Sequence, residues 1–364
     1  MKVSILSMQR VVNYGSFLQA YALKKVLESK QNSVSFVDIL PGKKLEAIES
    51  SNRKKRYMSL LKRDIRQILG QRKQKKKFSK VYNEFAKKYL KLSDEKIFDI
   101  KSDISIIGSD EVFNCACPSP WGFTTQLFGE NITANKIVTY AASCGSTKIE
   151  DINRFNLQED IKNALKNVNE ISVRDENTYN VISALTNKTI ANVLDPTFLY
   201  NYEEEINNIK VSEENFIILY AYPARFLDKR EVDAVKNFAR EKNKKIIAIG
   251  FYQYWCDKNL ILNPFEFLAY IKKADYIITD TFHGTVFSIK YNKNFCTFVR
   301  ESNKNKLDDL LNKFNLQSRK IEDVNNMKKV LNTQIDYNNV NKIIQAKKDQ
   351  SIEFLENAMQ GVKE

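Results

Sequence analysis

A chain of 364 residues is long enough for about two domains, and 43% hydrophobic with 11% aromatic residues suffice for buried cores. No apolar run approaches the roughly 18 residues of a membrane span, and the first run is shorter than a signal-peptide core, so we expect a soluble, cytoplasmic protein. A single histidine excludes His-based metal sites, five scattered cysteines predict no disulfide framework, and neither a Walker loop nor a G-x-G-x-x-G motif occurs.

The net charge of +14 is concentrated in residues 43–91. This segment holds 18 basic and 4 acidic residues, which leaves 40 of each kind in the rest of the chain. Apolar residues recur at helical spacing between the cations and predict one or two amphipathic helices. A solvated helical face explains such charge, and so does attraction to an anionic membrane or a lipid-linked substrate. No base-reading motif accompanies the cations, so we expect no nucleic-acid partner.

The first half of the chain alternates apolar runs with helical patterns. "KVSILS", a helix beginning at "FLQAYAL" and "SVSFVDIL" form a β-α-β unit within the first 40 residues. Further strands are predicted over 103–108, 136–143, 170–175 and 190–195. We therefore expect an N-terminal Rossmann-like domain over residues 1–204, with the basic helical segment 43–91 as an insertion.

The alternation restarts after a polar stretch. Strands are predicted over 216–223, 244–250, 275–280 and 295–300, with helical patterns between them. We expect a C-terminal Rossmann-like domain over 205–335, and a helix within 336–364 that packs back on the N-terminal domain. Strands alternating with helices predict parallel sheets covered on both faces, so the fold class is α/β, with two such domains facing a cleft.

Candidate site residues are those that follow the strands, because open parallel sheets bind ligands outside the carboxyl ends of their strands. These candidates are Asn13, Tyr14, Gly15, Ser109, Asp110, Glu111, Arg174, Asp195, Asp280 and Arg300.

The only histidine, His283, follows the strand predicted over 275–280. Gly284 and Thr285 come next and open a helix, whose first amide groups lack internal partners and attract phosphate or carboxylate. An imidazole beside a bound anion can exchange a proton near physiological pH. A structural histidine under a loop is the alternative, but the place at a strand end close to Asp280 favours catalysis.

The other candidates have structural alternatives of equal or nearly equal weight. The Arg174 guanidinium suits a carboxylate or phosphate, but a surface ion pair with Asp175 or Glu176 explains it equally well. Helix capping accounts for the segment around Asn13. The segment "GSDEVFN" supplies side chains that bind sugar hydroxyls, and a plain turn explains it nearly as well.

Six segments in order resemble the polysaccharide pyruvyl transferase family between residue 3 and about residue 320. They are "NYGSFLQAYAL", "IIGSDEVFN", "YAASCGS", "ISVRDENT", "NVLDPTFL" and "YIITDTFHGTVFSI". The resemblance implies a fold of the two-domain GT-B type and transfer of the enolpyruvyl unit of phosphoenolpyruvate onto a sugar, usually as a cyclic ketal. The products are capsule, exopolysaccharide or cell-wall polymers.

The resemblance also implies roles for single residues. His283 matches the family's general acid or base, and Arg174 matches the arginine that holds the donor; Asn13, Gly15, Asp110 and Asp195 match positions of less certain role. Phosphoenolpyruvate is a substrate, so neither a cofactor nor a metal is expected. A sugar acceptor linked to a lipid would bring the enzyme to the inner face of the membrane, where the basic segment would hold it as a peripheral protein.

This chain departs from the family pattern at two places. Some members read R-L-H at the histidine, whereas Thr281 and Phe282 stand here, so a second donor arginine is missing and Arg300 is the candidate replacement. Glu111 and Phe113 stand where Gln and Trp are common, which leaves the acceptor sugar open. Two alternatives therefore remain: a GT-B-type glycosyltransferase that uses a nucleotide sugar, and a non-catalytic scaffold in a polysaccharide assembly complex.

Overall fold

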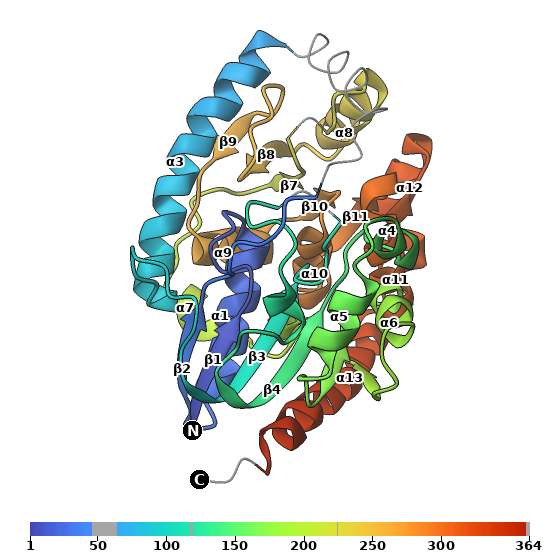
Figure 1. Cartoon of the computed structure of the whole chain (residues 1–364). Helices are drawn as coiled ribbons and strands as arrows, with labels where there is room; N and C mark the ends of the chain where they lie inside the picture. Colours follow the sequence, from blue (N-terminus) through green and yellow to red (C-terminus); the bar gives the residue numbers. More distant parts are fainter. Residues whose placement is uncertain (46–63, 117–118, 224, 362–364) are drawn as a thin grey trace. The chain divides into compact units, whose positions relative to one another are not determined.

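The computed structural model describes residues 1–45, 64–116, 119–223 and 225–361 (Figure 1). The first part of the predicted basic insertion, residues 46–63, thus lies outside the described residues. The chain divides into two compact units: unit 1 comprises 1–47, 86–201 and 342–364, and unit 2 comprises 48–85 and 202–341. Each unit is built on one six-stranded sheet in which every neighbouring pair of strands is parallel. The predicted α/β class with two parallel sheets is confirmed.

The sheet of unit 1 has the strand order β2-β1-β3-β4-β5-β6. Its strands are β1 (Lys2–Leu6), β2 (Ser33–Val37), β3 (Ser102–Asp110), β4 (Ala134–Ala142), β5 (Ile171–Val173) and β6 (Ile190–Asn192). Its helices are α1 (Tyr14–Glu28), α4 (Ile149–Arg154), α5 (Gln158–Leu165) and α6 (Glu176–Ser183), with short 3-10 helices at Thr125–Phe128 and Pro196–Phe198.

Both faces of the unit 1 sheet are buried. Leu6 and Ile107 face a core that the apolar side chains of α4, α5 and α6 complete. Their neighbours Ile5 and Ile106 are equally buried but lie outside that core, because successive side chains of a strand point to opposite faces. Burial on both faces explains why these strands appear in the sequence as continuous apolar runs.

The sheet of unit 2 has the strand order β12-β11-β10-β7-β8-β9. Its strands are β7 (Phe216–Tyr220), β8 (Lys245–Ile249), β9 (Lys258–Leu260), β10 (Tyr276–Thr279), β11 (Asn294–Phe298) and β12 (Lys320–Ile321). Its helices include α7 (Glu203–Ile206), α8 (Lys229–Glu241), α9 (Pro264–Lys273), α10 (Phe282–Lys290), α11 (Lys304–Lys313) and α12 (Met327–Asn332). The edge strands β9 and β12 are not predicted, because β9 reads KNL, with a single apolar residue, and β12 has only two residues.

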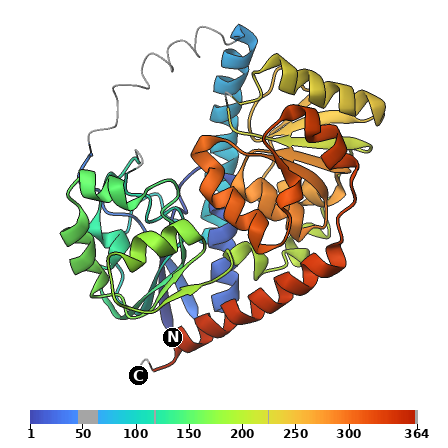
Figure 2. The ribbon, with the colours of Figure 1, turned by 90° about the vertical axis from the view of Figure 1, so that its right-hand side faces the viewer.

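Helices cover the unit 2 sheet on both sides (Figure 2). Side chains of α8 and α12 share a core with Leu219, Ile278 and Cys296. Aromatic contacts join α9 to the sheet and to α10: the Phe267 ring lies 4.9 Å from that of Tyr220 on β7 and 5.9 Å from that of Phe287 on α10. The start of α10 is thereby fixed at the carboxyl edge of the sheet.

The described part of the basic segment forms one helix, α3 (Ile65–Leu90). Its residues up to 85 pack within unit 2: the Tyr254 amide donates to Gln67 Oε1 at 2.9 Å, and the rings of Phe85 and Phe265 lie 4.8 Å apart. Within the described ranges, no helix combines the length and the apolar character needed to cross a bilayer.

The last helix, α13 (Tyr337–Met359), packs within unit 1 from residue 342 onward. Its Phe354 ring lies 6.4 Å from that of Tyr140, and Lys30 forms an ion pair with Glu356. The buried Ser351 hydroxyl accepts a hydrogen bond from the Leu194 amide at 2.9 Å. One side-chain oxygen on α13 therefore satisfies a backbone donor that follows β6.

We expect Ser351→Ala to lower the free energy of unfolding by about 1–3 kcal/mol, because the buried Leu194 amide loses its acceptor. Urea denaturation measures the difference. Ser183→Ala is the matched control, since the Ser183 hydroxyl donates to a carbonyl of its own helix at an exposed position; it should stay within about 0.5 kcal/mol of the wild type. Equal losses for the two variants would contradict this account of α13.

Candidate functional site

The predicted site residues divide between the carboxyl edges of the two sheets. Asn13, Tyr14, Gly15, Ser109, Asp110, Glu111, Arg174 and Asp195 belong to unit 1, and Asp280, His283, Gly284, Thr285 and Arg300 belong to unit 2.

His283 is the second residue of α10, directly beyond the carboxyl end of β10. The side chain is largely buried, with 8% of the residue exposed. Its ring lies 5.2 Å from that of Phe282, nearly perpendicular to it, and 6.3 Å from that of Phe287. Two aromatic rings therefore restrict the orientation of the imidazole at the beginning of the helix.

The start of α10 is capped by Thr281. Its hydroxyl accepts a hydrogen bond from the Gly284 amide at 2.9 Å, and its carbonyl accepts one from the Thr285 amide at 3.2 Å. Both amides predicted to hold an anion are thus used inside the helix start, and an anion could reach the Gly284 amide only by displacing the Thr281 hydroxyl. A Cβ on Gly284 would lie 2.2 Å from Thr279 Oγ1, so glycine permits the close contact between α10 and β10.

Asp280 directly follows β10, and its fully buried carboxylate holds the neighbouring loop. Oδ1 accepts from the Tyr222 amide at 3.1 Å, and Oδ2 accepts from Arg225 Nη1 at 3.0 Å. Burial raises the pKa of the Asp280 carboxyl, and the positive charges of Arg225 and Arg300 oppose part of that rise.

Arg225 is a site candidate that the sequence analysis missed. Its side chain is 24% exposed, and its Nη2 donates to Ser302 Oγ at 2.9 Å. Because β7 and β10 are parallel neighbours, the loop after Tyr220 lies beside the loop after Thr279. The sequence does carry a signal for it, because Arg225 is a polar residue that follows the apolar run "FIILYAYP".

Arg300, the predicted replacement for the missing donor arginine, forms a bidentate ion pair instead. Its Nη1 and Nη2 donate to the two carboxylate oxygens of Glu231 at 2.6 and 2.9 Å. The guanidinium also lies 5.4 Å from the Phe298 ring centre. Burial lowers the pKa of Arg300, but the hydrogen bonds and charge of Glu231 more than compensate, so the pKa is raised. Its fork is therefore already occupied by a carboxylate of the protein.

The edge of unit 1 centres on Arg174, which is almost fully buried. Its Nη1 donates to Asp195 Oδ2 at 3.0 Å, its Nη2 lies 3.7 Å from Asp110 Oδ1, and its Nε lies 4.0 Å from Asp175 Oδ2. Burial lowers the pKa of Arg174, but Asp195, Asp110, Asp175 and Glu111 together outweigh it, so the pKa is raised. The pair with Asp175 considered from the sequence is present at 4.0 Å, but it is buried and belongs to a network with Asp195 and Asp110.

Each aspartate around Arg174 has a second partner that fixes its position. Asp195 Oδ1 accepts from the amide and the hydroxyl of Thr197 at 3.0 and 2.7 Å. Asp110 has φ of 82°, and its Oδ2 accepts from Ser16 Oγ at 2.7 Å. Asp175 caps α6 through the Thr178 amide at 2.9 Å. Ser16, on the first turn of α1, is the second residue that the sequence analysis missed.

The remaining unit 1 candidates have structural partners. Asn13 caps α1 by accepting from the Gly15 amide at 2.8 Å, as capping alone predicted. Tyr14 and Ser109 are fully buried, and the Ser109 hydroxyl donates to Gln19 Oε1 at 2.7 Å. Glu111 Oε2 accepts from Asn114 Nδ2 at 2.6 Å.

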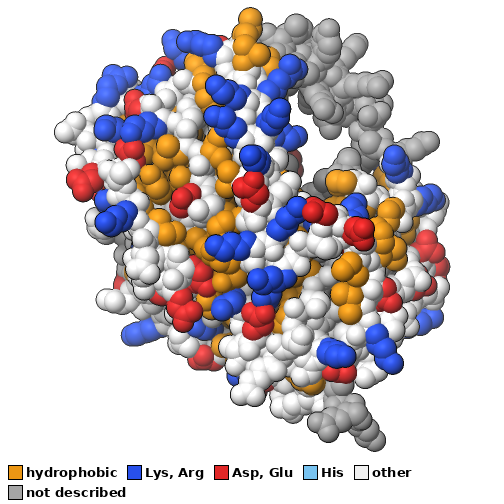
Figure 3. Space-filling model, turned by 90° about the vertical axis from the view of Figure 1, so that its left-hand side faces the viewer, with side chains coloured by type: hydrophobic (Ala, Val, Ile, Leu, Met, Phe, Trp, Pro, Cys, Tyr) orange, Lys and Arg blue, Asp and Glu red, His pale blue; other side chains and the backbone are white. Residues whose placement is uncertain are grey.

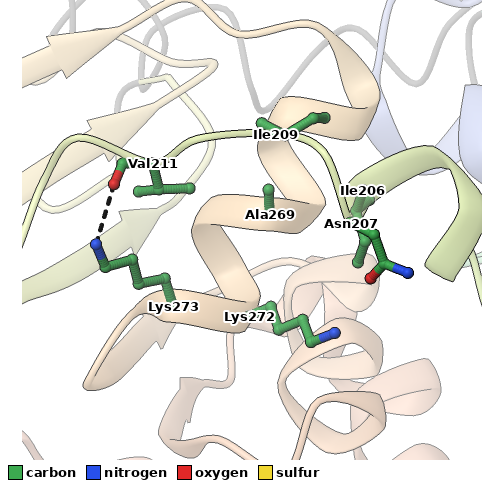
Figure 4. Close-up of a pocket in the computed structure, with 7 residues that line it drawn as sticks. All are labelled: Ile206, Asn207, Ile209, Val211, Ala269, Lys272 and Lys273. Atoms are coloured by element: carbon green, nitrogen blue, oxygen red, sulfur yellow. Dashed lines mark hydrogen bonds between the residues drawn. The ribbon is translucent and has the colours of Figure 1, made fainter.

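A surface pocket of about 360 Å³ lies elsewhere in unit 2, between the loop after α7 and α9 (Figure 4). The lysines in its lining are engaged: Lys273 Nζ donates to the Val211 carbonyl at 3.0 Å, and Lys272 Nζ pairs with Glu203 at 2.8 Å. None of the predicted site residues lines it. Across the part of the chain that the structure describes, no group of three or more His, Cys, Asp or Glu side chains is arranged to hold a metal ion.

Comparison with known proteins supports the fold and the family. A family model described as polysaccharide pyruvyl transferase matches residues 13–303. No curated protein sequence matches the chain significantly.

Two solved structures illustrate the fold. A UDP-GlcNAc 2-epimerase from Methanocaldococcus jannaschii, in complex with UDP-GlcNAc and UDP, is 10% identical with a TM-score of 0.50, over 95% of this chain and 99% of that chain. The glycotransferase of kitacinnamycin is 8% identical with a TM-score of 0.50, over 98% of each chain. At these identities the likeness concerns the fold alone, and the predicted GT-B-like fold is confirmed.

The network around Arg174 predicts a large effect on stability. Arg174→Gln removes the charge that neutralises Asp195, Asp110 and Asp175 in a buried site, and we expect a loss of about 3–5 kcal/mol in the free energy of unfolding. Arg154→Gln, at an exposed position of the same unit, is the matched control and should change it by less than about 0.5 kcal/mol. Urea denaturation compares the two variants, and similar losses would show that the buried network contributes little.

Proposed function

Because the chain belongs to the polysaccharide pyruvyl transferase family, we propose that it moves the enolpyruvyl group of phosphoenolpyruvate onto two hydroxyls of a sugar, as a ketal. Family membership makes it a transferase of polysaccharide biosynthesis with a pyruvyl donor and a polysaccharide acceptor. The identity of the donor, the ketal product and a lipid-linked acceptor are the parts that we propose.

The observation that carries the proposal is the position of His283, the only histidine of the chain, at the start of α10 beside the Asp280 loop. An imidazole exchanges protons near neutral pH. The start of a helix favours negative charge, and Arg225 adds a partly exposed cation at the same sheet edge. To react, a phosphorylated enol acid needs a proton donor for its methylene carbon and positive charge to hold its anionic groups, and this edge supplies both.

The reaction proceeds in balanced steps. His283 gives a proton to the methylene carbon of phosphoenolpyruvate, which leaves positive charge at C2. One sugar hydroxyl adds to C2 and loses its proton; the bond between C2 and the phosphate oxygen then breaks. A second hydroxyl adds to C2 and closes the ketal. One of the two hydroxyl protons replaces the proton that His283 gave to the methylene carbon, and the other leaves with phosphate.

Arg225 is the cation that we propose for the donor at this edge. Arg225 and Arg300 each donate through both terminal nitrogens, but Arg300 donates both bonds to the Glu231 carboxylate, whereas one bond of Arg225 goes to the neutral Ser302 hydroxyl, which an anion can replace at lower cost. A charge-assisted hydrogen bond contributes about 1.5–3 kcal/mol. Arg225 would thus fill the place of the arginine that is missing where Thr281 stands, and Arg300 would support the loop.

The resemblance also assigns Arg174 to the donor, but its surroundings favour an indirect role. A donor anion could bind its guanidinium only by replacing Asp195 or Asp110, because the side chain is 2% exposed and lies among three carboxylates. We propose that Arg174 and Asp195 position Asp110, whose side chain is 11% exposed, and that the Asp110 carboxylate accepts hydrogen bonds from acceptor hydroxyls. Asn13, Gly15 and Glu111 would lie at the rim of that acceptor region.

The central test uses the full chain with phosphoenolpyruvate and, in a parallel arm, UDP-GlcNAc. A bound donor raises the melting temperature, so phosphoenolpyruvate should stabilise the protein and the nucleotide sugar should not. With sugar acceptors, including lipid-linked ones, inorganic phosphate should be released and the acceptor should gain the mass of a pyruvyl ketal. Stabilisation by UDP-GlcNAc alone would favour a glycosyltransferase, and stabilisation by neither would favour a scaffold.

His283→Gln should lower the rate of phosphate release by about 10² to 10⁴, because the general acid is lost. The rise in melting temperature that saturating phosphoenolpyruvate causes should be nearly the same in this variant as in the wild type, since the variant keeps the helix start and Arg225. A variant that retains full rate would refute a catalytic role for His283.

Arg225→Gln should raise KM for phosphoenolpyruvate by about 10- to 150-fold, which corresponds to the loss of one charge-assisted contact. The matched variant Arg300→Gln should raise it by much less. Arg225→Gln alone leaves the buried Asp280 carboxylate without its cation, and the double variant Arg225→Gln/Asp280→Asn removes that charge as well. If Arg225 binds the donor, KM for phosphoenolpyruvate should stay raised in the double variant. A larger effect at Arg300 than at Arg225 would reverse the assignment.

A further inference from the structure

One face of α3 is exposed and carries no acidic residue over its first 16 residues. Buried positions such as Gln67, Gln74 and Phe78 recur along the other face, where the helix packs within unit 2. Between Ile65 and Lys80 the chain has seven basic residues and no acidic one. The exposed residues of this stretch are Ile65, Arg66, Leu69, Arg72, Lys73, Lys75, Lys76, Lys77 and Lys80.

Most of this charge is not neutralised by the rest of the chain. Arg66 pairs with Asp64 at 2.5 Å, and Lys80 lies 4.0 Å from Glu84. The five basic residues between them have no ion-pair partner among the residues that the structure describes: Arg72, Lys73, Lys75, Lys76 and Lys77. The surface therefore attracts an extended anionic partner.

Two large apolar side chains share this face. Ile65 is 72% exposed and Leu69 is 60% exposed, the two highest values among the exposed large hydrophobic residues. They lie one turn apart, and Lys76 and Lys80 continue the same line along the helix at 11 and 15 residues from Ile65. Figure 3 shows Lys and Arg side chains along α3 and hydrophobic side chains at its beginning, at the top of the view.

We propose that this face of α3 docks on an anionic lipid bilayer. Lysine and arginine side chains reach the headgroups, while Ile65 and Leu69 enter the boundary with the acyl chains, as in helices that lie in a membrane interface. The helix over Ile65–Lys80 is about 24 Å long, enough to lay its cations along a lipid surface. The proposal goes beyond the transferase chemistry and does not depend on it.

A bilayer explains the face better than nucleic acid does. Single-stranded nucleic acid is held by cations together with exposed aromatic rings on which bases stack. On α3 the aromatic side chains Phe78 and Tyr82 are buried and the exposed non-polar groups are aliphatic, while the neighbouring exposed ring of Tyr254 is already stacked by the Arg66 guanidinium at 4.8 Å. Aliphatic groups at the end of a basic stripe contribute nothing to phosphate binding, but they add buried area at a lipid interface.

The test is co-sedimentation of the full chain with vesicles of phosphatidylcholine alone or with added phosphatidylglycerol. We expect binding only to the anionic vesicles, and weaker binding as salt rises. Lys73→Gln/Lys76→Gln/Lys80→Gln should lower the vesicle affinity at least tenfold. The matched control Lys229→Gln/Arg240→Gln/Lys245→Gln removes the same charge from exposed positions elsewhere in unit 2 and should leave affinity within about threefold.

A second variant tests the apolar part. Ile65→Ser/Leu69→Ser keeps every charge and should also lower vesicle affinity at least several-fold, while binding to a single-stranded oligonucleotide stays unchanged. Melting temperatures of all variants should match the wild type, because the altered side chains are exposed. No sedimentation with anionic vesicles, equal losses of affinity for the α3 triple variant and the control triple variant, or an unchanged affinity for the serine variant would each overturn the proposal.

Discussion

Parallel pairing of every strand is the constraint on which the rest of this structure depends. A parallel sheet brings all carboxyl ends to one edge, and helices that connect its strands cover both faces with apolar side chains. Charged groups cannot be accommodated in those faces without partners. Most of the buried charged groups lie instead at the carboxyl edges, in the loops that follow β3, β5, β6, β7, β10 and β11. The candidate site residues of each unit are therefore found in these loops.

The two sheet edges differ in charge, and this difference supports the proposal that unit 2 binds the donor and unit 1 binds the acceptor. In unit 1 a single buried arginine, Arg174, lies among Asp110, Asp175 and Asp195, so carboxylates outnumber cations. In unit 2 the buried Asp280 has the positive charges of Arg225 and Arg300 near it. An excess of carboxylates suits the hydroxyls of a sugar, whereas partly exposed guanidinium groups suit a phosphorylated acid.

Buried ionic groups also limit how these edges can change. Removing one partner of such a pair leaves an uncompensated charge in a site with little water, which costs far more than a surface ion pair contributes. Arg174 therefore stabilises the geometry of its neighbours whether or not it meets a ligand. The same argument explains why Asp280 joins two loops through the Tyr222 amide and Arg225: a buried carboxylate needs several donors.

Sequence patterns predicted the α/β class, every strand of the unit 1 sheet, four strands of the unit 2 sheet, the family and the candidate histidine. These follow from local patterns: continuous apolar runs, helical periodicity, and polar residues where an apolar run ends. The edge strands β9 and β12 were not predicted, because β9 carries a single apolar residue and β12 has only two residues.

Only the tertiary structure decided the partners of the charged groups. The sequence places Arg174 beside Asp175 and Glu176, yet its closest partner is Asp195, 21 residues away, because β5 and β6 are neighbours in the sheet. Arg300 pairs with Glu231 across 69 residues, and Arg225 reaches Asp280 across 55. Strand order sets these pairings, and strand order follows from packing over the whole unit, which no local pattern contains.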